Sequence, residues 1–125
     1  MKHNIDNVIY RSEDVLMKIV KEKENIIQVT PENFKAEVLE CDKPVLVIFY
    51  AAWDQPCRMQ QAELDTIADK HPDIKVCKLD VEEYPAFAQQ YGIMMIPTTI
   101  AFKDGKKYKR ATGLRRAGVL LSMVQ

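Results

Sequence analysis

An unbroken apolar run from Val45 to Tyr50 is the strongest feature in the pattern of hydrophobic and polar positions along this chain. The run is rich in β-branched and aromatic residues, and its length is typical of a strand that is covered on both faces. A segment with helical spacing follows over 57–70. The residues expected on the inward side of this helix are Met59, Leu64, Ile67 and Ala68. The pattern therefore predicts a buried strand that leads through a short turn into a long helix.

Shorter apolar segments before and after this pair predict the rest of the fold. Thr30 followed by Pro31 is a typical helix start, and Asp104-Gly105 is a strong hairpin signal. Further strands are expected over 26–29, 74–80, 97–103 and 107–112. Further helices are expected after Thr30, over 84–91 and over 114–125. This order of elements predicts an α/β domain with a mixed sheet between helices.

Residues 1–25 form an extension before this domain, which spans 26–125. Ser12, followed by two acidic residues, is a typical helix start. An apolar stripe follows it at Val15, Leu16, Ile19 and Val20. An extra N-terminal helix packed on the domain is expected, and a partner-binding helix is the alternative. For residues 1–10, disorder is a further alternative.

Composition and charge limit the class of protein more than they identify it. A length of 125 residues with 47% hydrophobic residues fits one globular domain. Lysine plus arginine and aspartate plus glutamate both number 18, so the net charge favours no particular partner. No apolar run approaches the ~20 residues of a membrane span, and the charged start does not resemble a secretory signal, so a cytoplasmic protein is expected. Three cysteines, Cys41, Cys57 and Cys77, give no disulfide framework, which agrees with a reducing compartment.

Neither a metal site nor a nucleic-acid site is expected. His3 and His71 lie far apart in the sequence, without cysteine or carboxylate at ligand spacing. Seven basic residues lie between Lys103 and Arg116, against Asp104 alone. A solvated hairpin face is the expected role of these residues, and a patch for nucleic acid or an acidic partner is the alternative.

The turn between the buried strand and the long helix carries a resemblance to a known family. It reads AAWDQPC from Ala51 to Cys57, and it is similar to the active-site turn of thioredoxins, which reads W-C-G-P-C. The downstream matches, in order, are Lys78-Leu79-Asp80, Tyr91-Gly92-Ile93, Ile96-Pro97-Thr98, Phe102-Lys103-Asp104-Gly105 and Gly113. The resemblance runs from about Ile26 to the C-terminus and implies a thioredoxin-like fold, with a central mixed sheet flanked by helices.

The resemblance also shows what this turn lacks. Thiol–disulfide exchange needs one thiolate to attack and a second thiol to resolve the mixed disulfide. The attacking cysteine of the family is Asp54 here, and the resolving cysteine is Cys57. Aspartate cannot attack a disulfide, but it is a good N-cap that can accept from the Cys57 N–H, and its charge disfavours a thiolate nearby. Dithiol reduction through this turn is therefore not expected.

Four further positions bear on that expectation. The buried acid that accepts a proton in thioredoxins falls at Ile48, an apolar residue, and the lysine that pairs with this acid falls at Lys78. Cys41 and Cys77 are expected to be inert thiols rather than resolving partners.

The resemblance implies that the surface that binds substrate in thioredoxins is retained. The resemblance implies a cis Ile96–Pro97 bond and an apolar groove that pairs with an extended chain. Met95 stands where the family has a small residue, and it is expected to fill or stiffen this groove. The expected groove residues are Trp53, Gln55, Pro56, Met95, Ile96, Pro97 and Gly113.

Three hypotheses follow for function. The leading one is a thioredoxin-like protein that binds an extended polypeptide or a protein partner without dithiol catalysis, as a monomer or weak dimer and without a cofactor. The alternative is an oxidoreductase that uses the single thiol of Cys57 with an external thiol to resolve the mixed disulfide. The third is a subunit held by its N-terminal helix.

Overall fold

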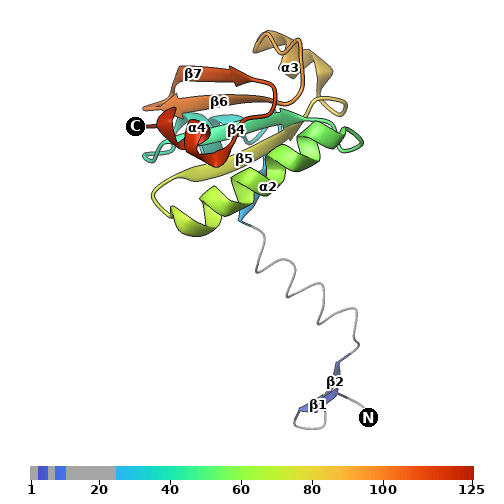
Figure 1. The fold of residues 1–125 in the computed structure, drawn as a ribbon. Helices are drawn as coiled ribbons and strands as arrows, with labels where there is room; N and C mark the ends of the chain where they lie inside the picture. The colour runs from blue at the N-terminus through green and yellow to red at the C-terminus, as the bar shows by residue number, and fades with distance from the viewer. Residues whose placement is uncertain (1–2, 6–7, 11–24) are drawn as a thin grey trace.

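The computed structural model describes residues 3–5, 8–10 and 25–125 of the chain (Figure 1). Its main body is built on a five-stranded sheet in the order β3-β5-β4-β6-β7. The strands are β3 (Ile26–Gln28), β4 (Val45–Tyr50), β5 (Lys75–Asp80), β6 (Thr98–Lys103) and β7 (Lys106–Thr112). β5 runs parallel to β3 and β4, whereas β6 runs antiparallel to β4 and β7. This is the mixed sheet that the sequence predicts, and each of these strands starts and ends within one residue of its predicted bounds.

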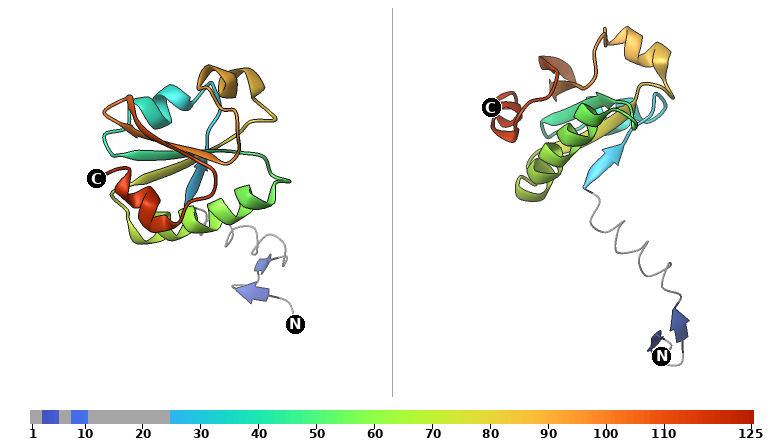
Figure 2. Two further views of the ribbon diagram at one scale, coloured as in Figure 1. Left: turned by 45° about the horizontal axis from the view of Figure 1, so that its top comes forward. Right: turned by 45° about the vertical axis from the view of Figure 1, so that its right-hand side comes forward.

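Helices cover both faces of the sheet, which gives the thioredoxin-like architecture that was expected (Figures 1 and 2). α2 (Gln55–Lys70) and α4 (Ala117–Ser122) pack on one face, and η1 (Lys35–Leu39) and α3 (Pro85–Gln90) on the other. All six residues of β4 are buried, because Leu46 and Ile48 point into the α2 side and Val45, Val47 and Phe49 into the η1 side. The central strand is apolar throughout for this reason.

Two helices differ from the prediction. The helix after Thr30 is a π-helix, in which the Glu40 N–H donates to the Lys35 carbonyl at 2.9 Å. It begins at Lys35 rather than at Pro31. Thr30 and Asn33 instead close the turn that precedes it, since the Asn33 N–H donates to Thr30 Oγ1 at 3.3 Å and the Thr30 N–H donates to Asn33 Oδ1 at 2.7 Å. α4 is shorter than the predicted 114–125, because Arg116 has an extended backbone that holds the chain out of helix until Ala117.

The described part of the N-terminal extension is a pair of short strands. β1 (His3–Ile5) and β2 (Val8–Tyr10) form an antiparallel pair in which Ile5 lies opposite Val8. The β-branched residues Ile5, Val8 and Ile9 favour this strand conformation. The helix predicted from Ser12 lies outside the described residues.

Candidate functional site

Three segments of the chain meet at one end of the sheet. β4 ends at Tyr50, and its neighbour Phe49 lies opposite Thr98 at the start of β6. Thr98 in turn lies opposite Thr112 at the end of β7. The turn after β4, the loop before β6 and the segment after β7 therefore lie side by side, and the Gly113 N–H donates to the Pro97 carbonyl at 2.7 Å. These segments carry all the predicted site residues.

Asp54 is the N-cap of α2. Its backbone is extended, Pro56 lies in the first helical turn, and its Oδ2 accepts a hydrogen bond from the Cys57 N–H at 3.0 Å. An aspartate in this position satisfies an N–H that the helix itself leaves unpaired, and its negative charge complements the helix dipole. The carboxylate thus occupies the helix N-terminus, where a thiolate would otherwise be stabilised.

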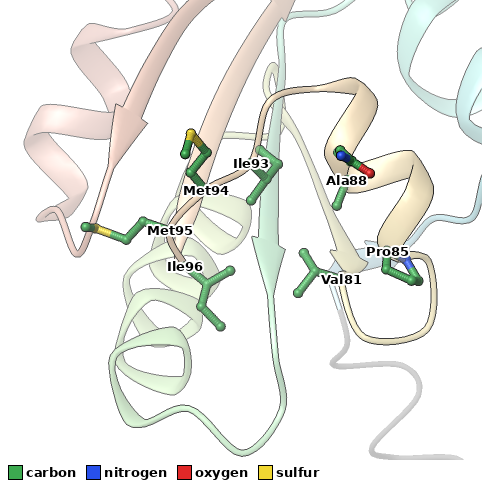
Figure 3. Close-up of a pocket in the computed structure, with 8 residues that line it drawn as sticks. Val81, Pro85, Ala88, Ile93, Met94, Met95 and Ile96 are labelled. Carbon is green, nitrogen blue, oxygen red and sulfur yellow. The ribbon is translucent and has the colours of Figure 1, made fainter.

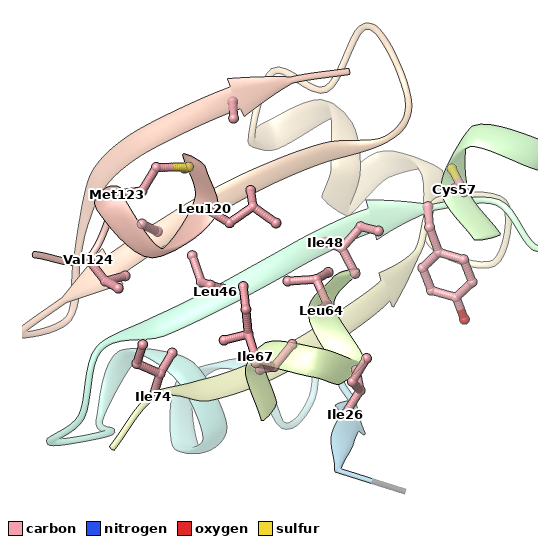
Figure 4. Close-up of a cluster of buried hydrophobic side chains, with 14 residues drawn as sticks. Ile26, Leu46, Ile48, Cys57, Leu64, Ile67, Ile74, Leu120, Met123 and Val124 are labelled. Atoms are coloured by element: carbon pink, nitrogen blue, oxygen red, sulfur yellow. The ribbon is translucent and has the colours of Figure 1, made fainter. Parts of the chain in front are cut away.

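Cys57 is buried and its thiol is held in the protonated form. Its side chain has 0% exposure and lies at one end of the core cluster between the sheet and α2 (Figure 4). Burial, together with the hydrogen bond and the negative charge of Asp54, raises the pKa of the Cys57 thiol to about 12 against the opposing effect of the Ala51 backbone. A thiol with this pKa is a poor nucleophile at neutral pH.

Cys57 has no proton acceptor at residue 48, where thioredoxins have a buried acid and this chain has isoleucine. Ile48 has 0% exposure and belongs to the same core cluster as Cys57. Lys78 lies opposite Ile48 on β5, and its Nζ lies 5.9 Å from the centre of the Tyr50 ring. An apolar side chain therefore fills the space beside this lysine on the strand.

Trp53 is oriented by a carboxylate that the sequence analysis did not single out. Its indole N–H donates to Glu82 Oε2 at 2.7 Å, while 64% of the residue stays exposed. The Asp80 carboxylate accepts from the Glu82 N–H at 2.8 Å and so positions the backbone of this partner. The tryptophan is thus an ordered apolar surface at the edge of the site.

The loop before β6 presents two methionines on a fixed backbone. Thr98 Oγ1 donates to the Met95 carbonyl at 2.6 Å, and Arg110 on β7 donates to the Gly92 carbonyl at 3.0 Å and to the Tyr91 carbonyl. The Ile96–Pro97 bond is cis, as expected. Met94 is 97% exposed and Met95 is 56% exposed, so both side chains are largely open to solvent.

An open pocket of about 510 Å³ lies on the α3 side of this loop (Figure 3). Of the predicted groove residues, it is lined by Met95 and Ile96. The other lining residues are Val81, Pro85, Ala88, Gln89, Ile93 and Met94. The other predicted groove residues are not among its walls: Trp53, Gln55, Pro56, Pro97 and Gly113.

One residue of α2 was placed on the wrong side by the sequence pattern. Met59, expected inward, is 49% exposed, whereas Gln60 has 0% exposure. Gln60 Nε2 donates to the Arg115 carbonyl at 2.9 Å, and the Arg115 N–H donates to Gln60 Oε1 at 2.8 Å. The spacing of Gln60 from Leu64 was the signal that could have identified it, because a polar residue on an inward stripe needs a buried partner.

Neither of the other cysteines joins the site. Cys77 is buried in the middle of β5 in the cluster on the η1 side, and burial raises the pKa of its thiol to about 12. Cys41 is half-buried and packs against the same cluster. All three cysteines are free thiols, and Cys57 lies in the cluster on the opposite face. Within the described residues, no group of His, Cys, Asp and Glu is arranged to hold a metal ion, and no helix is long and apolar enough to cross a membrane.

Comparison with known proteins agrees with this geometry. The profile of the thioredoxin family matches residues 25–125. The chain belongs to the thioredoxin family. It is 43% identical over 101 residues to a thioredoxin of Mycobacterium tuberculosis, which covers 80% of this chain and 87% of that protein. It is 48% identical over 86 residues to thioredoxin 1 of Synechococcus elongatus, covering 68% and 80% of the two chains. A thioredoxin of Alicyclobacillus acidocaldarius is 47% identical over 85 residues, covering 67% and 80%.

Within the thioredoxin family, the chemistry of this turn is set by Asp54. A thioredoxin turn with two cysteines places one thiolate at the helix N-terminus and the second thiol one turn further on. In this member the helix N-terminus holds a carboxylate, and the thiol one turn further on is buried and protonated.

Proposed function

We propose that this thioredoxin-family protein binds an extended polypeptide across the groove of Trp53, Met95, Ile96 and Gly113 and carries out no dithiol–disulfide exchange. The observation that carries the proposal is the Asp54–Cys57 cap: the carboxylate accepts from the Cys57 N–H at 3.0 Å, in the place of an attacking thiolate. A carboxylate neither forms nor breaks a bond to sulfur in exchange, so the turn can orient a partner but cannot reduce it.

The groove has the features of a polypeptide-binding surface. Trp53, Met94 and Met95 are exposed apolar side chains, and aromatic residues and methionine are enriched at protein interfaces. Within residues 25–125, the N–H and C=O of Ile96 make no hydrogen bond. An extended chain laid beside this loop would pair with these two groups, as in other complexes in which a peptide adds to a sheet edge.

The alternative of single-thiol exchange at Cys57 is less well supported by the site. An attacking thiol has to reach the substrate sulfur as a thiolate, whereas Cys57 has 0% exposure and its pKa is raised to about 12. Ile48 offers no carboxylate to accept the proton.

Binding of a labelled peptide tests the proposal directly. The probe is a fluorescein-labelled peptide of alternating valine and serine, without cysteine, and the readout is fluorescence anisotropy. Met95→Asp should abolish binding because it places a charge in the apolar groove. The matched control is Tyr108→Asp, which changes a residue of similar exposure, 48% against 56%, near the opposite end of β7.

The proposal holds if the unaltered protein and Tyr108→Asp bind the probe alike and Met95→Asp does not. Absence of binding to the unaltered protein would overturn it, as would equal binding by Met95→Asp. Reduction of a peptide disulfide at a rate that Cys57→Ser abolishes would favour the single-thiol alternative instead.

A further inference from the structure

The segment that follows β7 forms one wall of the groove and is locked to α2. Gln60, fully buried, is hydrogen-bonded to both the N–H and the carbonyl of Arg115, at 2.8 and 2.9 Å. Glu63 Oε1 accepts from the Ala117 N–H at 2.8 Å. The backbone between Gly113 and Ala117 is therefore held in one place by two polar side chains of a long helix.

This locked segment carries basic side chains beside the groove. Arg115 Nη1 lies 3.6 Å from the point where a Cβ on Gly113 would be, and both Arg115 and Arg116 are exposed. Figure 3 shows the Met95 side chain extending toward this C-terminal part of the chain. Because the Gly113 N–H donates to the Pro97 carbonyl at 2.7 Å, the Arg115 guanidinium lies close to the loop that carries Met95.

The carboxylate that the contacts place beside this segment is that of Glu63, which accepts from the Ala117 N–H and forms no recorded ion pair with either arginine. From Gly105 to Gln125 the chain has no acidic residue. Within residues 25–125 the recorded ion pairs join Lys35 to Glu40 and Lys75 to Glu37, and neither Arg115 nor Arg116 takes part in one.

The Trp53 side of the groove has the opposite charge. Glu82 accepts from the indole N–H of Trp53, and the next residue along the chain, Glu83, is exposed. Asp54, which directly follows Trp53, caps α2. The chain as a whole has equal numbers of acidic and basic residues, 18 of each, so this separation reflects where the charges lie rather than their total.

We propose that the polypeptide bound in this groove is acidic: a carboxylate next to the apolar residue that contacts Met95 pairs with Arg115 and Arg116. This inference rests on the polypeptide-binding function proposed above. Arginine on a fixed backbone suits the recognition of a carboxylate, since its planar fork forms two parallel hydrogen bonds and less freedom is lost on binding. Charges at the rim of a groove select among partners that share the same apolar anchor.

Three peptides with one apolar centre test the charge preference. They share the valine–serine core and differ only in flanking residues, which are aspartate, serine or lysine, and binding to the full chain is followed by fluorescence anisotropy. The aspartate peptide should bind most tightly and the lysine peptide most weakly. The double variant Arg115→Glu with Arg116→Glu should weaken the aspartate peptide by about tenfold and strengthen the lysine peptide.

The matched control reverses two charges of the β6–β7 hairpin, away from the groove. Lys103→Glu with Lys106→Glu changes the net charge by the same amount as the double arginine-to-glutamate variant. Lys103 and Lys106 lie opposite each other, so a pair of positive charges becomes a pair of negative charges. This control should keep the preference for aspartate. Arg115→Gln with Arg116→Gln, which adds no repulsion, should lose the preference for the aspartate peptide over the serine peptide. Thermal unfolding of each variant verifies that it is folded.

The outcomes separate this inference from the proposed function. Equal binding of the three peptides overturns the acidic partner and leaves polypeptide binding intact, whereas failure of all three to bind overturns both. Loss of the aspartate preference in the Lys103→Glu, Lys106→Glu control overturns the assignment to Arg115 and Arg116. Two further outcomes would overturn the proposal that the groove binds an acidic polypeptide. One is that labelled oligothymidylate binds as tightly as the aspartate peptide. The other is that a second copy of this chain binds in place of peptide.

Discussion

Ile48 on β4 lies directly opposite Thr99 on β6, and the Thr99 hydroxyl has no hydrogen-bond partner in the described part of the chain. Both side chains are buried, with 0% and 1% exposure. A carboxylate at position 48, where thioredoxins keep their buried acid, would offer an acceptor for this hydroxyl. With isoleucine there, the proton route to Cys57 and the acceptor for Thr99 are missing together.

Thr99→Val should therefore stabilise the protein. Replacing an unpaired buried hydroxyl by a methyl group removes a desolvation penalty of roughly 1 kcal/mol or more. The control is Thr98→Val on the same strand, whose hydroxyl donates to the Met95 carbonyl at 2.6 Å and whose loss should destabilise. Urea unfolding measures both, and equal destabilisation by the two variants would show that Thr99 does have a partner.

Asp54 should contribute to stability as a helix cap. Asp54→Ala removes the acceptor of the Cys57 N–H and should lower the unfolding free energy by about 0.5–2 kcal/mol. Asp54→Asn keeps an oxygen acceptor and should cost less. The comparison is made by chemical unfolding at neutral pH, and an alanine variant as stable as the unaltered protein would speak against the cap.

The three thiols should differ in reactivity. Cys41 is half-buried, whereas Cys57 and Cys77 have 0% exposure. In the native protein at neutral pH, a disulfide reagent such as DTNB should modify Cys41 alone, and unfolding should expose all three cysteines. Cys41→Ser should remove the native reaction. Rapid modification that persists in Cys41→Ser and disappears on adding Cys57→Ser would reveal a working thiol at Cys57.

Stability should fall at alkaline pH. The folded state raises the pKa of both Cys57 and Cys77 from the ordinary 9.0 to about 12. Above pH 9 the unfolded chain releases protons that the folded chain retains, so the unfolding free energy decreases as pH rises toward 12. Chemical unfolding between about pH 8 and 10 should show this decline, with a shallower slope in Cys57→Ala with Cys77→Ala. The same slope in the variant would mean that other groups cause it.

The parts of this protein that depend on local sequence were predictable. β4 is a continuous apolar run, Asp54 comes shortly before a proline at the start of a helix, and Asp104-Gly105 is a hairpin turn. In each case neighbouring residues alone determine the local structure. The phase of a helix is set by what packs on it, which is why Met59 was wrongly predicted to be buried and the buried Gln60 was missed. Residues that act from a distance were not predictable, since Glu82 meets Trp53 only after the sheet has formed.

Asp54→Cys should rebuild part of the missing chemistry. The fold places residue 54 at the helix N-terminus, where a thiolate is favoured, with Cys57 one turn further on. The pair should form a disulfide on air oxidation and regain reductase activity below that of an ordinary thioredoxin, because Ile48 accepts no proton and positioned proton transfer contributes typically about 10²-fold. A variant unable to close the disulfide would show that the turn lacks thioredoxin geometry.

The most direct test of the central claim is the reduction of insulin disulfides by the unaltered protein with a dithiol donor. Asp54→Cys serves as the positive control, and Asp54→Ser, which caps the helix without supplying a thiol, sets the background. The account predicts that the unaltered protein gives no turnover above Asp54→Ser, while Asp54→Cys does. Turnover by the unaltered protein equal to or above that of Asp54→Cys, and abolished by Cys57→Ser, would contradict it.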